Sequence, residues 1–172
     1  MVLPNNLKAD EYHPFYGTYV KLVQNAPLND TLGQGKKRFV DFLQAIPIEK
    51  YPYRYAENKW SVAELVLHII DAERVFQYRA LRFARNDATP LQGFDQDCYV
   101  PESNAGKRTK DSIIWEYETV RNATISLFGS FEPEALLRKG LASGSPMSVR
   151  ALGFVICGHQ MHHQKILEER YL

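Results

Sequence analysis

The stretch that most constrains the fold is WSVAELVLHIIDAERVFQYRALRFAR, residues 60–85, an amphipathic helix with clear signals at both ends. Ser61 and Glu64 form an S-x-x-E capping box, which predicts that the helix begins near Val62. The segment NDATP that follows Arg85 predicts that it ends there. The helix is therefore about 24 residues, or roughly 36 Å, long.

Three further segments repeat hydrophobic residues with the helical period, and no segment alternates convincingly with the two-residue period of a strand. They cover residues 28–46, 109–128 and 148–170. Pro47 ends the first, and Ser148 is a candidate N-cap for the last. A shorter helical piece is expected around Phe15–Val23. Four long amphipathic helices predict an all-α fold, a four-helix bundle, in a single domain over residues 1–172.

The connection between the second and third long helices, residues 86–108, is unusually long and rich in turn-forming residues. An extended chain of about two dozen residues reaches roughly twice the length of the preceding helix. It can therefore cross the whole bundle and start the third helix parallel to the second. We expect the order up-down-down-up, in which helices 62–85 and 148–170 are antiparallel, whereas an up-down-up-down bundle would need only a short turn here.

Composition excludes several classes of function. Twenty-one basic and 20 acidic residues give a formal net charge of +1, which offers no electrostatic case for binding nucleic acid or an anionic membrane. The N-terminal residues lack the apolar core of a signal peptide, and the apolar runs are too short to cross a bilayer. Two cysteines do not make a disulfide framework. We expect a cytoplasmic protein with a small-molecule substrate.

Three of the five histidines lie in the segment GHQMHHQ, residues 158–164. At 100° per residue, His159 and His163 fall inside the apolar stripe of their helix, and His162 falls at its edge. Histidines at i and i+4 can bind one metal ion from a single helix. The alternative is two core histidines that hydrogen-bond to the backbone or to water.

A third histidine in a helix favours a metal site over two hydrogen-bonded core histidines. His68 lies about seven residues after the start of its helix, and His163 lies about seven residues before the end of its own. In antiparallel helices these positions are level, whereas in parallel helices they would be offset by roughly 12 Å. The matching positions of His68 and His163 agree with the up-down-down-up order of helices inferred from the long connection. The sequence therefore predicts a metal site made of His68, His159 and His163.

Other polar residues have two interpretations each. Asp71 and Glu73 can hydrogen-bond a ligating imidazole and orient it, or form salt bridges on the helix surface, which is the favoured alternative for Glu73. Arg79, on the same stripe as His68, can bind an anionic group of a substrate or pair with a core carboxylate. Glu64 is expected to be used by the capping box.

Four aromatic residues precede the helix that carries His68, and they either line the mouth of a pocket or plug the end of the bundle. They are Tyr51, Tyr53, Tyr55 and Trp60. The two cysteines are weaker candidates for a site. Cys157 points away from His159. Cys98 is alone in the long connection, and we assign it no role.

The motifs W-S-x-x-E-x-x-x-H at residues 60–68 and G-H-x-x-H-H at residues 158–163 resemble those of the DinB/YfiT-like superfamily of metal-binding four-helix bundles. The resemblance extends from PFYGTYVKLV, residues 14–23, to the C-terminus. It implies a metal triad on His68, His159 and His163, and it leaves His162 out. The family is similar to bacillithiol and mycothiol S-transferases and to a maleylpyruvate isomerase that uses mycothiol, and many of its members have no known activity.

We expect a divalent metal ion, zinc or nickel first and iron or manganese as alternatives, together with a low-molecular-weight thiol as a candidate cofactor. The expected function is a metal-dependent S-transferase or hydrolase acting on a small molecule, in a protein that forms a homodimer. The alternative is a non-catalytic, metal-stabilised bundle that serves as a stress-related or oligomerisation module. Structural ions normally have four protein ligands, and the sequence supplies three, which favours the enzyme. The sequence identifies no catalytic residue beyond the ligands.

Overall fold

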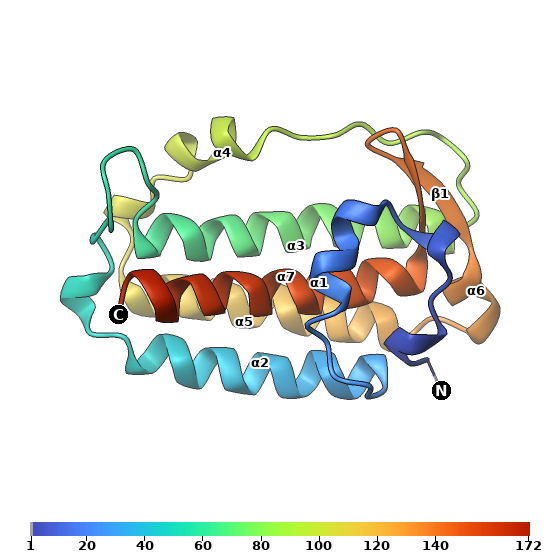
Figure 1. Ribbon diagram of the computed structural model, residues 1–172, viewed down its shortest axis with the longest axis horizontal. Coiled ribbons are helices and arrows are strands. Elements are labelled where there is room, and N and C mark those ends of the chain that lie inside the picture. The colour runs from blue at the N-terminus through green and yellow to red at the C-terminus, as the bar shows by residue number, and fades with distance from the viewer. Residues whose placement is uncertain (1) are drawn as a thin grey trace.

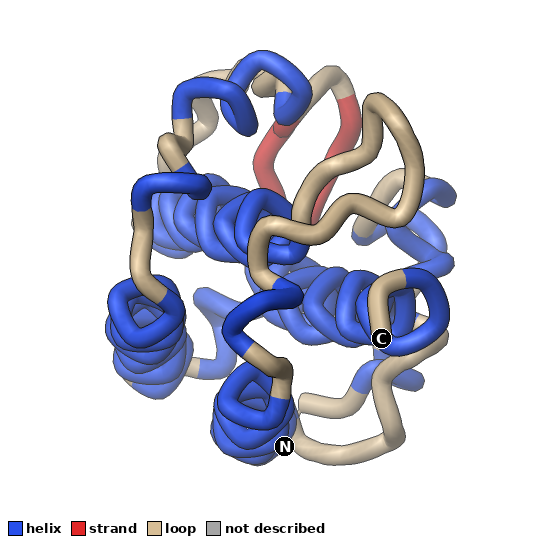
Figure 2. Tube along the Cα trace, turned by 90° about the vertical axis from the view of Figure 1, so that its left-hand side faces the viewer, coloured by secondary structure: helices blue, strands red, loops and turns tan. Residues whose placement is uncertain are grey.

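The computed structural model describes residues 2–172 and confirms the all-α four-helix bundle. The four long helices are α2 (Leu28–Ala45), α3 (Val62–Ala84), α5 (Lys110–Gly129) and α7 (Val149–Arg170). Figure 1 shows that α3 and α5 run in one direction and that α2 and α7 run in the other, which is the predicted up-down-down-up order. Figure 2 looks along the bundle, with the long helices seen nearly end-on.

The predicted caps of the two helices that carry the histidines are present. Ser61 Oγ accepts a hydrogen bond from Glu64 N, and the Glu64 carboxylate accepts one from Ser61 N, so the capping box is complete. Ser148 Oγ accepts from Ala151 N at 3.1 Å and caps α7. These local signals fix where each helix begins, and they thereby set the levels of His68, His159 and His163.

The connection over residues 86–108 crosses the length of the bundle, as predicted (Figure 1). It is not unstructured, because it contains the short helix α4 (Gln96–Glu102) and a turn of 3-10 helix, η5 (Ala105–Lys107). Asp95 caps α4 by accepting a hydrogen bond from Asp97 N. The crossover is therefore an ordered cover over α3.

The sequence prediction missed a small antiparallel sheet as well as two short helices, α4 and α6 (Pro133–Leu137). Strands β1 (Lys139–Ala142) and β2 (Ser145–Ser148) form a hairpin between α6 and α7. Ser143 and Gly144 make its two-residue turn, and both have a positive φ, 51° and 77°. The crossover pairs with this hairpin through Leu91, whose N–H donates to Leu141 O.

The N-terminal segment lies across α7. It consists of three single turns of 3-10 helix, followed by the one-turn helix α1 (Gly17–Val20) in the region predicted to be helical. The 3-10 turns are η1 (Pro4–Asn6), η2 (Ala9–Glu11) and η3 (Pro14–Tyr16), and a fourth, η4 (Ile48–Lys50), follows α2.

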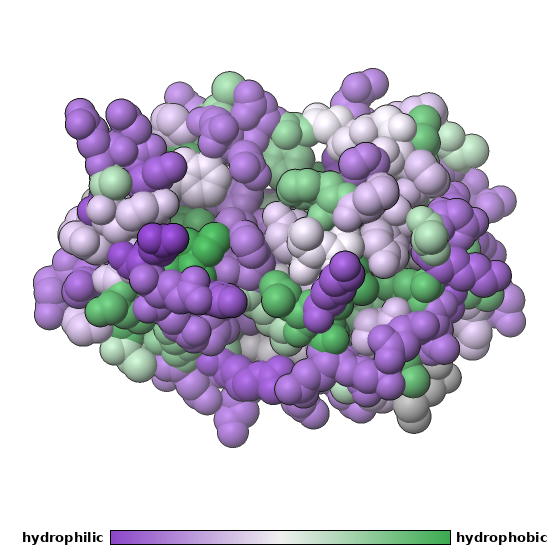
Figure 3. All heavy atoms as spheres, in the orientation of Figure 1, coloured by the Kyte–Doolittle hydropathy of each residue, from purple (hydrophilic) through white to green (hydrophobic). Residues whose placement is uncertain are grey.

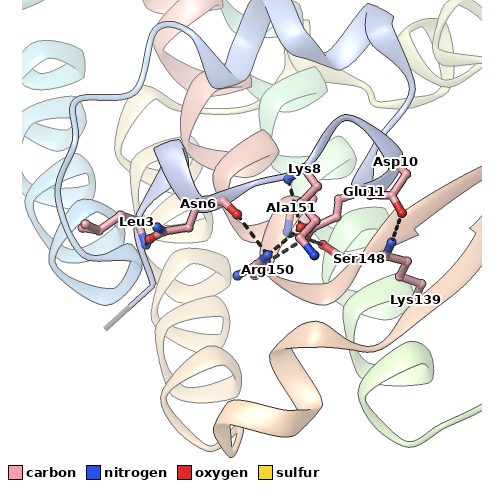
Figure 4. Close-up of polar contacts among 9 residues, drawn as sticks. All are labelled: Leu3, Asn6, Lys8, Asp10, Glu11, Lys139, Ser148, Arg150 and Ala151. Atoms are coloured by element: carbon pink, nitrogen blue, oxygen red, sulfur yellow. Dashed lines mark hydrogen bonds and ion pairs between the residues drawn. The ribbon is translucent and has the colours of Figure 1, made fainter.

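Glu11 fastens this segment to the start of α7 (Figure 4). The buried Glu11 carboxylate accepts hydrogen bonds from Arg150 Nε at 2.8 Å and from Ser148 Oγ at 2.7 Å. Burial alone would raise the pKa of Glu11, but the hydrogen bonds from Arg150, from Lys8 N and from Ser148 lower it to about 2. Glu11 is therefore ionised at neutral pH, and it holds the N-terminal segment to the start of α7.

The hydrophobic core has two parts, one toward each end of the bundle. Along α5, Arg121 and Thr124 separate Val120 of one part from Phe128 of the other. Buried polar residues gather where the two parts meet, and we call them the polar layer. Its members are His68, Glu73, Arg121, Thr124, His159 and Gln160. No helix within residues 2–172 is both long enough and apolar enough to span a lipid bilayer.

Candidate metal centre

The structure brings together the three histidines that the sequence singled out. His159 Nε2 lies 3.1 Å from His68 Nε2 and 3.1 Å from His163 Nε2, and the three nitrogens all lie within 4.8 Å of one another. His68 comes from α3 and the other two from α7, one helical turn apart. The antiparallel pairing of α3 and α7 therefore puts His68 level with the α7 pair.

All three imidazoles are held in the neutral form. Burial lowers the pKa of His68 to about 4, and burial together with the charges of His68 and His162 lowers that of His163 to about 3. Burial, with its three histidine neighbours, lowers the pKa of His159 well below its ordinary value. At neutral pH the triad consequently offers neutral nitrogens, the protonation state in which histidine binds a metal ion.

This donor set fits a divalent metal ion. A neutral imidazole nitrogen carries either one hydrogen or one lone pair, so His159 Nε2 cannot form two good hydrogen bonds at once with the nitrogens that face it at 3.1 Å. A single cation satisfies all three nitrogens together. Two imidazoles bound to one tetrahedral zinc ion have their nitrogens roughly 3.3 Å apart, close to the observed spacing.

The other histidine of the cluster and the two cysteines lie apart from the triad. His162 is half-buried at the edge of α7, with its ring against Tyr19 at a centroid distance of 5.3 Å. Cys157 is buried, and Cys98 is exposed on α4. Hydrogen bonding to Asp95 and the charge of that carboxylate raise the pKa of Cys98, which makes it a poor nucleophile.

Neither candidate carboxylate on α3 orients an imidazole. Asp71 pairs with Arg74 at 3.3 Å. Glu73 forms a salt bridge, as favoured, but the expected surface location is wrong: it is 2% exposed and accepts two hydrogen bonds from Arg121, at 2.7 and 2.8 Å. His163 Nδ1 is buried and has no hydrogen-bond partner among residues 2–172, so nothing in this part of the chain fixes that ring from behind.

Three of the four aromatic residues before α3 divide between the two predicted roles, whereas Tyr53 is exposed and packs edge-on against Tyr171. Tyr51 is buried and donates a hydrogen bond to Leu43 O, so it plugs the end of the bundle. Trp60 packs on the His68 ring at a centroid distance of 4.9 Å. Trp60, Tyr55 and His163 line one cavity of about 590 Å³. Asp97 and Tyr171 also line it, and neither was predicted because they come from distant parts of the chain.

A second wall of the centre comes from α1 and was not predicted. The ring of Tyr19 meets the His159 ring edge-on at 5.3 Å, and Phe76 meets it at 6.1 Å. A Cβ atom at Gly158 would collide with the backbone of Tyr19. The glycine in the G-H pair of the motif, next to His159, was the available signal for this close approach. Figure 3 shows hydrophobic residues in patches along the middle of this face, where α1 and α7 lie in Figure 1.

Replacing Gly158 with alanine is expected to push α1 off α7. The collision should lower the free energy of unfolding by about 1–3 kcal/mol, despite the better helix propensity of alanine. Gly33→Ala is the matched control, because that glycine also lies inside a helix and a Cβ added there would meet no atom within 4 Å; it should raise stability by about 0.5–1 kcal/mol. Urea unfolding of both variants measures this, and equal effects would contradict the close packing of α1.

Comparison with known families identifies the chain. The family model of the DinB superfamily matches residues 31–167, which include the three histidines. The chain belongs to the DinB superfamily. No curated protein is significantly similar to this DinB-superfamily chain in sequence.

Two solved structures share the fold of this DinB-superfamily chain. YfiT from Bacillus subtilis, described as a probable metal-dependent hydrolase with an unusual four-helix bundle topology, is 11% identical, with a TM-score of 0.75 over 92% of this chain and 91% of that chain. YjoA, a DinB-like protein from Bacillus subtilis, is 20% identical, with a TM-score of 0.58 over 82% of this chain and 86% of that chain. At such identities the likeness establishes the fold alone.

Proposed function

We propose that this DinB-superfamily chain binds one divalent metal ion through His68, His159 and His163 and is a metal-dependent enzyme acting on a small molecule. Zinc or nickel is proposed first, with iron and manganese as alternatives. The reaction is hydrolysis or S-transfer with a low-molecular-weight thiol. One observation carries the proposal: three neutral, converging imidazoles are joined by no fourth histidine, cysteine or carboxylate from the described part of the chain.

The number of ligands separates this proposal from a non-catalytic, metal-stabilised bundle. Structural zinc sites normally have four protein ligands, whereas catalytic sites have three and an open position. An ion held by three neutral imidazoles keeps its full charge and lowers the pKa of a water or thiol bound at the open position toward neutrality.

The surroundings of the triad support binding of the small molecule on the His163 side. His163 is the triad member that lines the cavity of about 590 Å³, a volume typical of small-molecule sites. Trp60 and Ile166 give this cavity apolar walls, and Lys59 and Asp97 give it one charge of each sign. On the opposite side, Tyr19 and Phe76 pack against His159 and exclude water from the triad.

The description of YfiT as a probable metal-dependent hydrolase supports the hydrolytic alternative by analogy of fold. S-transfer is supported by the chemistry of the donor set, because three neutral ligands leave a charge that favours a bound thiolate. The two reactions differ in whether a thiol occupies the open position.

A cobalt-substituted protein distinguishes these alternatives. If the reaction is S-transfer, millimolar 2-mercaptoethanol should give a sulfur-to-metal charge-transfer absorption band near neutral pH, and screening with epoxides, maleyl compounds and chlorinated aromatics follows. The His162→Ala variant should keep the band and His159→Ala should lack it. A spectrum that ignores the thiol argues against S-transfer and leaves hydrolysis. A fourth protein ligand found in the cobalt form would contradict both reactions.

A further inference from the structure

Arg79 is a buried guanidinium without a negative partner. It is 2% exposed, and it forms no ion pair with any carboxylate of residues 2–172. Arg121, equally buried, is paired with Glu73 through two hydrogen bonds. A buried charge is normally paired, because its transfer out of water is costly. Of the two alternatives raised for Arg79, the pairing with a core carboxylate is therefore wrong.

The bonds that Arg79 does make leave much of its donor capacity unused. Only Nη2 is engaged: it donates to Gln92 O at 3.0 Å and to Ser143 Oγ at 2.9 Å, which ties the crossover to the hairpin turn. Nε and Nη1 make no hydrogen bond within the described chain, yet neither is sealed from solvent. A guanidinium has five N–H donors in a planar fork, and this geometry matches an oxyanion.

A cavity of about 340 Å³ lies between the N-terminal segment and the hairpin turn, and Arg79 reaches it through Ser143 rather than as a lining residue. Its lining contains no carboxylate and several hydrogen-bond donors. The lining residues are His13, Phe15, Tyr16, Ala142, Ser143 and Ser145. Ser143 connects the cavity to the buried charge. Ser143 lines the cavity, and its Oγ accepts a hydrogen bond from Arg79 Nη2. His13 Nδ1 accepts from Phe15 N, so in its neutral form the ring carries its proton on Nε2 and is a donor there.

We propose that this cavity binds an oxyanion, the carboxylate or phosphate group of a small molecule, with the hydroxyl of Ser143 as a donor and with Arg79, which lies behind that hydroxyl, as the counter-charge. The site is separate from the metal centre. Phe76 stands between them, with its ring 5.9 Å from Arg79 Cζ and 6.1 Å from the His159 ring. Anion binding is consequently independent of the proposed metal and of the proposed reaction.

Isothermal titration of the metal-free full chain with succinate and with inorganic phosphate, at matched ionic strength, tests the site. At least one of these anions should bind saturably, with one site per chain. Whichever anion binds more tightly shows whether the site prefers a carboxylate or a phosphate group. Arg79→Met should weaken binding by about tenfold or more. Arg170→Met, which removes an exposed positive charge, is the matched control and should bind as the unmodified chain does.

Ser143→Gly keeps the test decisive if Arg79→Met fails to fold. It removes the hydroxymethyl side chain, and glycine suits the positive φ of 51° at this position. It should weaken binding of the same anion. Because it also removes one of the two hydrogen bonds of the buried Arg79, the melting temperature in the absence of anion should fall by a few degrees, while the circular dichroism spectrum of the folded chain stays the same. Absence of saturable binding to the unmodified chain, or equal affinity in Ser143→Gly and the unmodified chain, would overturn the proposal and leave Arg79 as a structural clamp.

Discussion

His159→Ala is expected to abolish stoichiometric metal binding, and His68→Ala is expected to do the same. His159 Nε2 is the central nitrogen of the triad, 3.1 Å from each of the other two. Its loss leaves only two protein nitrogens, which are too few to hold a metal ion stably. After loading with zinc and desalting, the metal content should fall from about one ion per chain to near zero. Mass spectrometry of metal content per chain measures this directly.

His162→Ala is the control for these variants. It removes a neighbouring imidazole that is half-buried at the edge of α7, outside the triad, so metal content should stay nearly intact. Loss of metal in His162→Ala, with retention in His163→Ala, would reverse the assignment of ligands. Circular dichroism of each variant shows whether lost metal reflects a lost ligand or a lost fold.

Glu73→Ala is expected to have the largest effect on stability. It would leave the Arg121 guanidinium, which is 0% exposed, without its carboxylate at the centre of the bundle, and it would also remove one of the two acceptors of the Thr124 hydroxyl. Breaking a buried ion pair from one side costs about 3–5 kcal/mol. Urea unfolding at neutral pH measures the loss in the free energy of unfolding.

The double variant Glu73→Leu with Arg121→Met separates charge from packing. Because no unpaired charge remains and the volumes are similar, it should recover most of the lost stability. A double variant as unstable as Glu73→Ala would mean that the geometry of the pair, rather than its charge balance, holds the bundle together. A loss below about 1 kcal/mol in Glu73→Ala would contradict the burial of the pair.

The parts of the fold that were predictable from the sequence are those with local causes. The capping box of Ser61 and Glu64, the cap at Ser148 and the stop at Pro47 each act within one helical turn, so they can be recognised without knowledge of the fold. The length of the crossover then indicated the antiparallel pairing of α3 with α7, and helical rise placed His68 level with His163.

The features that were missed depend on contacts between distant segments. The strands of the hairpin have four residues each, too few for an alternating pattern to stand out, and the Ser143–Gly144 turn was its only local mark. Nothing near Glu73 indicates that Arg121, 48 residues later, lies opposite it. The approach of Tyr19 to His159 and the contact of Glu11 with Ser148, formed across 137 residues, are likewise contacts between distant segments.

The crossover has a consequence for the order of events in folding. His68 and His159 are 91 residues apart, and pairing of the helices that carry them closes a loop that contains the crossover and α5. Contacts between residues so distant in the chain form slowly, because a large loop must close first. A metal ion at the triad would therefore bind a chain that is already collapsed. Unlike the ion of a zinc finger, it would slow unfolding rather than start folding.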